Sequence, residues 1–128
     1  MKNKVVEKMI IAFPIQANEG LEGILADHFG RAPHFVIYET ELKELRTIDN
    51  TAEHFGGRVA TPMLLDKNKV KVLICRGLGR RAIARFEELG MDVYITKHQN
   101  VGQALDAYNK GELPLVTDED GCAGRHSD

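Results

Sequence analysis

The sequence is poor in cysteine, contains no tryptophan and has no long apolar run. Its two cysteines, Cys75 and Cys122, stand in unlike surroundings, one ending an apolar run and one in a glycine-rich tail, so we expect reduced thiols and no disulfide. The longest apolar runs, such as Met9–Ile15, fall far short of the roughly 20 residues of a membrane-spanning helix, and the N-terminus lacks an apolar signal region. We therefore expect a cytoplasmic protein with no membrane partner.

An excess of charge of one sign is also lacking. The formal net charge is −2, and no basic stripe of the kind that binds nucleic acid is present, so we expect no nucleic-acid partner. The 128 residues suffice for one domain with its own core. We expect a single α/β domain over residues 1–116 and a flexible C-terminal tail over residues 117–128, where the chain becomes polar and rich in glycine.

Apolar runs predict three buried strands: Met9–Phe13, Val70–Cys75 and Asp92–Thr96. Pro14 has no N–H for a sheet ladder, so the first strand is expected to end there. A long loop over residues 16–33 follows, and the β-rich runs Phe35–Tyr38 and Leu42–Ile48 then predict an antiparallel hairpin.

Helical spacing and end signals predict three helices: from Thr61 to about Asn68, through Ile83 and Phe86 to Gly90, and from the cap Asn100 to Gly111. Right-handed crossovers make the later strands parallel to the first and place helices on both faces of the sheet. The expected fold class is α/β, a three-layer α/β/α sandwich with a mixed sheet of about five strands.

Two loops that leave the carboxyl ends of the parallel strands are the candidate site, because open α/β sheets bind ligands there. One contains residues 27–33 and the other residues 76–81. Glycine lets backbone N–H groups approach a ligand, a helix N-terminus adds partial positive charge, and arginine pairs with anions. We expect an anionic cargo. The candidate binding residues are His28, Gly30, Arg31, Gly77, Gly79 and Arg80.

Each of these features also has a purely structural interpretation. Gly77-Leu78-Gly79 lacks the third glycine of a dinucleotide fingerprint and any P-loop lysine, so taken alone it is more typical of a plain strand-to-helix turn. His28 is also compatible with a turn histidine hydrogen-bonded to the backbone. Cys122 and His126 offer two metal ligands, which do not complete a tetrahedral site, and they are equally explained as incidental residues of the tail.

The segment from His28 to Pro33 and the segment from Arg76 to Ala82 resemble those of the dinitrogenase iron-molybdenum cofactor-binding family, small proteins that carry or help insert nitrogenase-type clusters. The similarity extends from about Lys8 to Leu113 and implies a ribonuclease H-like α/β/α fold. It implies an iron–molybdenum or iron–sulfur cluster as cargo, and cluster donor and acceptor proteins as partners.

The resemblance also implies a site. It assigns the cluster contact to His28 with Gly30 and Arg31, and it makes Cys122 and His126 supplementary metal ligands. Many relatives carry a Gly-Gly-Cys-Ala-Pro stretch before the first long helix, whereas this chain has Arg58 after Gly56-Gly57 and offers no thiolate there.

An enzyme of the same fold, a metal-dependent nuclease or phosphoryl-transfer protein, is the alternative. Such a site needs clustered carboxylates that hold two divalent ions about 4 Å apart. The first strand has no Asp or Glu, and Asp27, Glu39 and Asp49 fall on a loop and at hairpin ends. A regulatory interaction module is a further alternative. We expect a non-catalytic binding or carrier protein.

Overall fold

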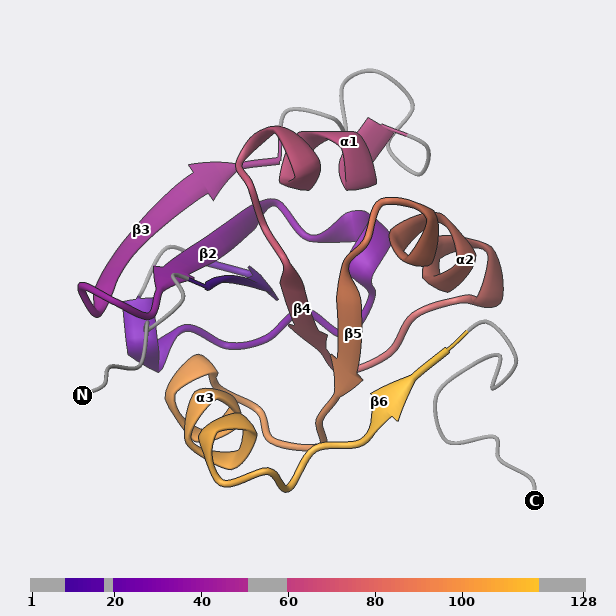
Figure 1. Ribbon diagram of the computed structural model, residues 1–128. Coiled ribbons are helices and arrows are strands. Elements are labelled where there is room, and N and C mark those ends of the chain that lie inside the picture. The colour runs from indigo at the N-terminus through magenta and orange to yellow at the C-terminus, as the bar shows by residue number, and fades with distance from the viewer. Residues whose placement is uncertain (1–8, 18–19, 51–59, 118–128) are drawn as a thin grey trace, which may run out of the picture.

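The computed structural model describes residues 9–17, 20–50 and 60–117 (Figure 1). The elements along these residues are β1 (Ile10–Ile15), η1 (Gly20–Glu22), η2 (Phe29–Arg31), β2 (His34–Glu39), β3 (Glu44–Asp49), α1 (Ala60–Lys67), β4 (Val72–Cys75), α2 (Arg80–Glu88), β5 (Asp92–Ile95), α3 (Val101–Asn109) and β6 (Leu115–Val116). The prefix η marks a single turn of 3-10 helix. The expected hairpin and the three expected helices are present.

The described strands form one mixed sheet in the order β3-β2-β1-β4-β5-β6. β1, β4 and β5 run parallel, whereas β2 and β6 run antiparallel to their neighbours. Figure 1 shows α1 and α2 on one face of the sheet and α3 on the other. The α/β class and the mixed sheet are therefore confirmed. No helix among the described residues is long and apolar enough to cross a membrane.

The sheet has one strand more than the expected number of about five. The addition is β6, which pairs with β5 through Val93–Val116 and Tyr94–Leu115. Two residues are too few to show an alternating pattern, and the strand lies where the chain begins to turn polar. Pairing with β5 rather than local sequence creates it.

Two apolar clusters, one on each face of the sheet, form the core. Alternation along β1 divides its side chains, so that Ala12 joins one cluster while Ile11, Phe13 and Ile15 join the other. The first cluster contains Phe86 of α2, and the second contains residues of α3. Because helices cover both faces, β1 and β4 are buried on both sides and read as continuous apolar runs.

Pro14 does not end the first strand, contrary to the sequence-based expectation. β1 continues to Ile15, and Pro14 pairs with Phe35 of β2. The Pro14 carbonyl accepts a hydrogen bond from the Ala26 N–H at 2.9 Å, on the side of β1 away from β2. In an extended strand the N and the carbonyl of one residue face the same side. The missing N–H therefore removes nothing from the β1–β2 ladder.

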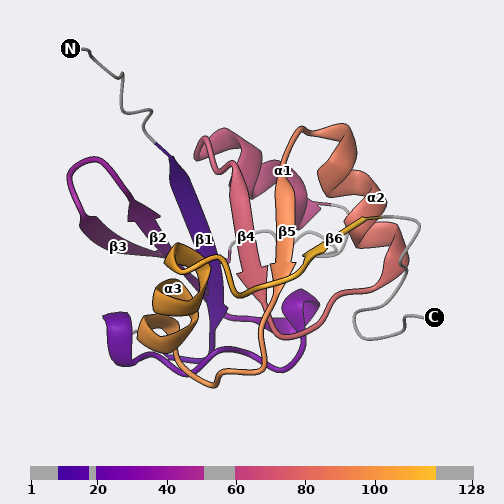
Figure 2. The same ribbon diagram turned by 60° about the horizontal axis from the view of Figure 1, so that its bottom comes forward.

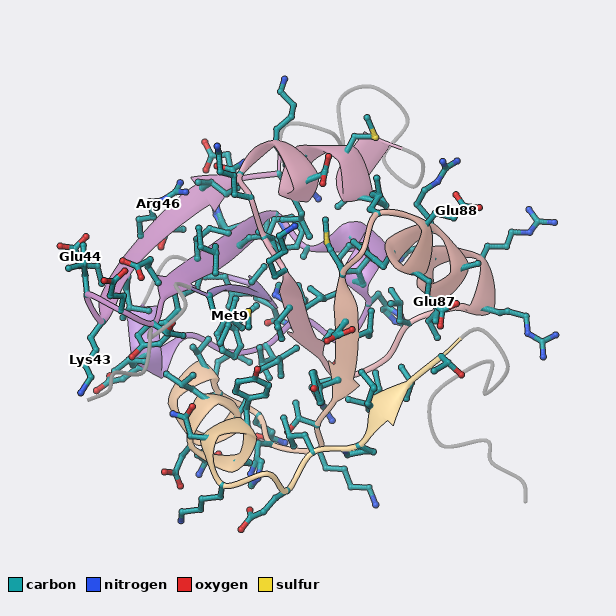
Figure 3. All side chains as sticks on the ribbon, in the orientation of Figure 1. Met9, Lys43, Glu44, Arg46, Glu87 and Glu88 are labelled. Atoms are coloured by element: carbon teal, nitrogen blue, oxygen red, sulfur yellow. The ribbon has the colours of Figure 1, made fainter. Side chains whose placement is uncertain are left out.

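The edge strand β3 carries exposed charged side chains. Figure 3 shows Lys43, Glu44 and Arg46 projecting outward along this edge. The Arg46 guanidinium donates to Asn68 Oδ1 at 3.3 Å, and Lys43 takes the left-handed conformation with φ 57° in the hairpin turn. Charge along an unpaired edge disfavours pairing with another chain.

Candidate binding site at the carboxyl edge of the sheet

The carboxyl ends of β1, β4 and β5 lie at one edge of the sheet because these strands are parallel. Figure 2 shows the arrowheads of β4 and β5 pointing to the edge where η2 and the segment leading into α2 lie. The described loops that leave this edge contain residues 16–17 and 20–33, 76–79, and 96–100. The first two include the loops expected to form the site.

A buried phenylalanine anchors the first loop. Phe29, the first residue of η2, is 6% exposed and lies among the residues of the core cluster that faces α2. Its ring meets the Phe86 ring edge-on with centroids 5.5 Å apart, and its centroid lies 5.7 Å from that of Phe35. These contacts fix the η2 turn against α2 and β2.

His28 and Arg31 stand on either side of this anchor, and both are exposed. The His28 carbonyl accepts a hydrogen bond from the Arg31 N–H at 3.0 Å, while the His28 ring makes no capping hydrogen bond to the turn. His28 therefore does not cap η2 through its side chain. Its imidazole faces solvent at the edge of the sheet.

An ion pair joins the first loop to the second. Arg76, directly after β4, donates from Nη1 to Asp27 Oδ1 at 2.6 Å. Both side chains are partly open to water, with 32% of Arg76 and 62% of Asp27 exposed. The structure thus brings together the two loops that were expected to form the candidate site.

The turn between β4 and α2 is fixed by Leu78, which is buried in the same cluster as Phe29. A Cβ at Gly77 or Gly79 would meet nothing within 4 Å, and neither glycine has a positive φ. Backbone strain therefore does not require these glycines, and the space beside the turn is open. Gly79 is the N-cap residue of α2, and because glycine has no side chain, no side-chain group caps this helix end.

The first turn of α2 contains two arginines and no acidic residue. Arg80 and Arg81 are both exposed, as expected for a solvated helix face. A helix N-terminus carries partial positive charge, so two cations there raise the local potential and favour a nearby anion. Arg85, one helical turn further, instead pairs with Glu88 at 3.5 Å.

A third loop at this edge was missed by the sequence analysis. Residues 96–100 follow β5, and Lys97 and His98 within them are exposed. Backbone hydrogen bonds fasten this segment to the first loop, since the Leu25 N–H donates to Gln99 O at 2.8 Å and the Val101 N–H donates to Gly23 O at 3.1 Å. The parallel direction of the third apolar run is the signal that could have revealed it.

Asn50 positions the exit of the first loop, and the sequence analysis missed it as well. Its side chain is 3% exposed, and its Nδ2 donates to the Ala32 carbonyl at 2.8 Å. Its backbone N–H donates to the Pro33 carbonyl at 2.9 Å, while its Oδ1 has no hydrogen-bond partner within the part of the chain that the structure describes. A lone asparagine after a predicted strand carries no sequence signal for such a role.

Cys75 ends β4 beneath this edge and is 1% exposed. Burial raises the pKa of its thiol to about 12, although a hydrogen bond from the Gly77 backbone acts in the opposite direction. A thiol with so high a pKa remains protonated and neither attacks nor binds metals. Cys75 is a free, buried core residue.

No group of three or more His, Cys, Asp and Glu side chains that could hold a metal ion occurs among residues 9–17, 20–50 and 60–117. His34 pairs with Asp49 through Nδ1 and Oδ1 at 3.0 Å. Cys122 and His126, the predicted supplementary ligands, lie outside the described residues, as does the glycine pair Gly56-Gly57.

The described residues form a small α/β domain built on one mixed sheet, and several of its loops lie at the carboxyl edge of the parallel strands. Residues 9–111 match the family described as dinitrogenase iron-molybdenum cofactor, and the chain belongs to that family. The matched region includes every candidate binding residue from His28 to Arg80 and ends before Cys122. The resemblance drawn from the sequence is therefore confirmed.

Individual proteins share sequence or fold with this chain. The chain is 31% identical over 113 residues to an uncharacterized protein of Methanocaldococcus jannaschii, covering 84% of this chain and 92% of the relative. A candidate NifB protein from Thermotoga, solved by NMR, is 29% identical with a TM-score of 0.74, covering 85% of this chain and 94% of that one. The apo form of the orange protein from Desulfovibrio gigas, 24% identical, has a TM-score of 0.78 and covers 88% and 96%.

Proposed function

We propose that this chain is a non-catalytic carrier for an anionic metal cluster of the iron–molybdenum or iron–sulfur type. The observation that carries the proposal is the exposed imidazole of His28 at an edge that also carries cationic side chains, in a chain that belongs to the iron-molybdenum cofactor family. Cluster donor and acceptor proteins are its partners, and the cytoplasm is its compartment.

The charges at the edge support an anionic cargo. Arg31, Arg80 and Lys97 are exposed and form no ion pair within the described residues. Asp27 is already paired with Arg76. Uncommitted cations on converging loops attract an anion and raise its local concentration.

Each candidate residue has a chemical role in this proposal. Neutral imidazole is a common metal ligand, and His28 supplies it from a loop anchored by Phe29. The guanidinium groups of Arg31 and Arg80 pair with sulfide or oxygen atoms on the cluster surface. The open backbone at Gly77 and Gly79 lets the cargo approach the start of α2. Cys122 and His126 remain proposed supplementary ligands.

The strand arrangement supports a ribonuclease H-like description of the fold. In the run β3-β2-β1-β4-β5, β2 alone runs against the others. Nuclease or phosphoryl-transfer chemistry on such a fold needs converging carboxylates. Ile10–Phe13 on the central strand offers none, and Asp27 is engaged by an arginine. These residues favour the carrier over the enzyme.

Anaerobic reconstitution of the apo-protein with ferrous iron, sulfide and molybdate tests the proposal. We expect retained metal and a visible absorption band after desalting. His28→Ala should lower metal retention several-fold without changing the fold, because the His28 ring is exposed and makes no capping hydrogen bond. Unchanged retention would remove His28 from the site.

A matched pair of arginine variants tests the location. Arg80 lies in the first turn of α2, whereas Arg85 is an exposed residue of the same helix paired with Glu88. We expect Arg80→Gln to weaken cluster retention and Arg85→Gln to leave it unchanged. Equal effects would mean that any surface cation serves, and the binding edge would then be assigned wrongly.

A further inference from the structure

The ion pair between Asp27 and Arg76 joins two loops of the proposed binding edge. Asp27 immediately precedes His28, and Arg76 immediately precedes the open turn at Gly77. Their side chains meet at 2.6 Å, although they are 49 positions apart in the chain. One cation of the edge is therefore already satisfied by a protein carboxylate.

The pair is not needed to hold the two loops together. Phe29 packs edge-on against Phe86, and Leu78 belongs to the same buried cluster. The Ala26 N–H, one residue before Asp27, is bonded to the Pro14 carbonyl at 2.9 Å. Buried apolar side chains in both loops and a backbone hydrogen bond in the first thus position the loops in addition to the charges.

The pair is also accessible and easily exchanged. The Asp27 side chain is 62% exposed and the Arg76 side chain 32% exposed, so water and salt weaken their attraction. A multiply charged anion at the edge offers Arg76 more negative charge than a single carboxylate does. Such a ligand can replace Asp27 as the partner of Arg76.

We infer that Asp27 is an internal competitor for the cargo, which holds Arg76 in the empty protein, yields it to the anionic cluster and takes it back when the cluster leaves. This inference rests on the proposed function. The exchange lowers the affinity for the cargo and speeds its release, and a carrier that hands its cargo to an acceptor needs both. Asp27 is thus a residue that tunes affinity through Arg76 without touching the cargo.

Tetrathiomolybdate, a tetrahedral dianion with a sulfide surface, is the probe. Its dissociation constant and its rate of loss to a chelating resin are measured for wild type, Asp27→Asn, Arg76→Gln and the double variant. We expect Asp27→Asn to tighten binding about two- to fivefold and to slow release, in keeping with the strength of exposed ion pairs. Arg76→Gln should weaken binding.

The double variant separates exchange from simple charge repulsion. If Asp27 acts through Arg76, Asp27→Asn changes affinity by less than about 1.5-fold once Arg76 is glutamine, so that the two substitutions are strongly coupled. If Asp27 only repels the anion through space, the gain persists in that background and the inference is wrong. Glu22→Gln, which removes an exposed acid from the same loop, should show no coupling to Arg76.

Failure of the inference and failure of the proposed function give different results. A wild-type protein that binds neither tetrathiomolybdate nor a reconstituted cluster overturns both. Binding by wild type with no gain in Asp27→Asn overturns only the exchange. Thermal unfolding of each variant checks that the protein remains folded. Asp27→Ser also removes the charge and must reproduce the sign of the Asp27→Asn effect.

Discussion

Truncation of the buried Phe29 side chain is expected to destabilise the protein and the η2 turn at the binding edge. The ring is 6% exposed and contacts both Phe86 and Phe35. Phe→Ala changes at buried sites cost about 3–5 kcal/mol. Each aromatic pair adds about 0.5–1.5 kcal/mol beyond burial alone. We expect Phe29→Ala to lower the free energy of unfolding by about 4 kcal/mol, a large part of the roughly 5–15 kcal/mol typical of a domain.

Phe29→Leu serves as the matched control. Leucine keeps most of the buried volume and loses the ring contacts, so we expect a loss of about 1–2 kcal/mol. Urea unfolding followed by far-ultraviolet circular dichroism measures both variants, since the chain has no tryptophan to report by fluorescence.

Hydrogen exchange gives a local readout for the same variants. The Ala32 N–H donates to the Phe29 carbonyl at 3.2 Å and should lose protection in Phe29→Ala. A destabilisation below about 1 kcal/mol, far under the range for a buried phenylalanine, would refute the role of Phe29 as the anchor of the loop.

Two further predictions concern the thiol below the edge and the helix beside it. Burial raises the pKa of Cys75 to about 12, above its ordinary value of 9.0, so stability should be intact below pH 9 and fall between pH 9 and 12 as the unfolded thiol ionises. Cys75→Ala should lack this part of the pH slope, and an equal slope in both proteins would contradict the assignment. The Asn100 side chain accepts from the Gln103 N–H at 2.8 Å, so Asn100→Ala should cost about 1 kcal/mol in urea unfolding. Gln99→Ala, an exposed neighbour, should cost nothing measurable, and similar losses in both would argue against the cap.

Features that depend on local pattern were predictable from the sequence. The apolar runs of β1 and β4 are continuous because both faces of these strands are covered, and the Asn100 cap is a local signal. Gly90 has a φ of 78°, which fits its predicted role in ending the second helix. The proximity of the two candidate loops was also predictable, since it needs only the parallel direction of β1 and β4.

Features created by contacts between distant residues were not predictable. The continuation of β1 through Pro14 depends on a hydrogen bond from Ala26, and the pairing of Asp27 with Arg76 joins two loops far apart in sequence. The hydrogen bonds from the Leu25 N–H to Gln99 O and from the Val101 N–H to Gly23 O likewise join segments far apart in sequence. Single-residue propensity contains no information about such partners.

The direction of β6 bears on how the tail could take part in binding. β6 runs antiparallel to β5, so the chain passes from Leu115 beside Tyr94 to Val116 beside Val93 and leaves heading away from the edge that carries His28. Cys122 is six positions beyond Val116, and an extended chain spans at most about 3.3–3.6 Å per residue. β6 therefore directs the chain away from the candidate site, while Cys122 and His126 lie outside the described residues.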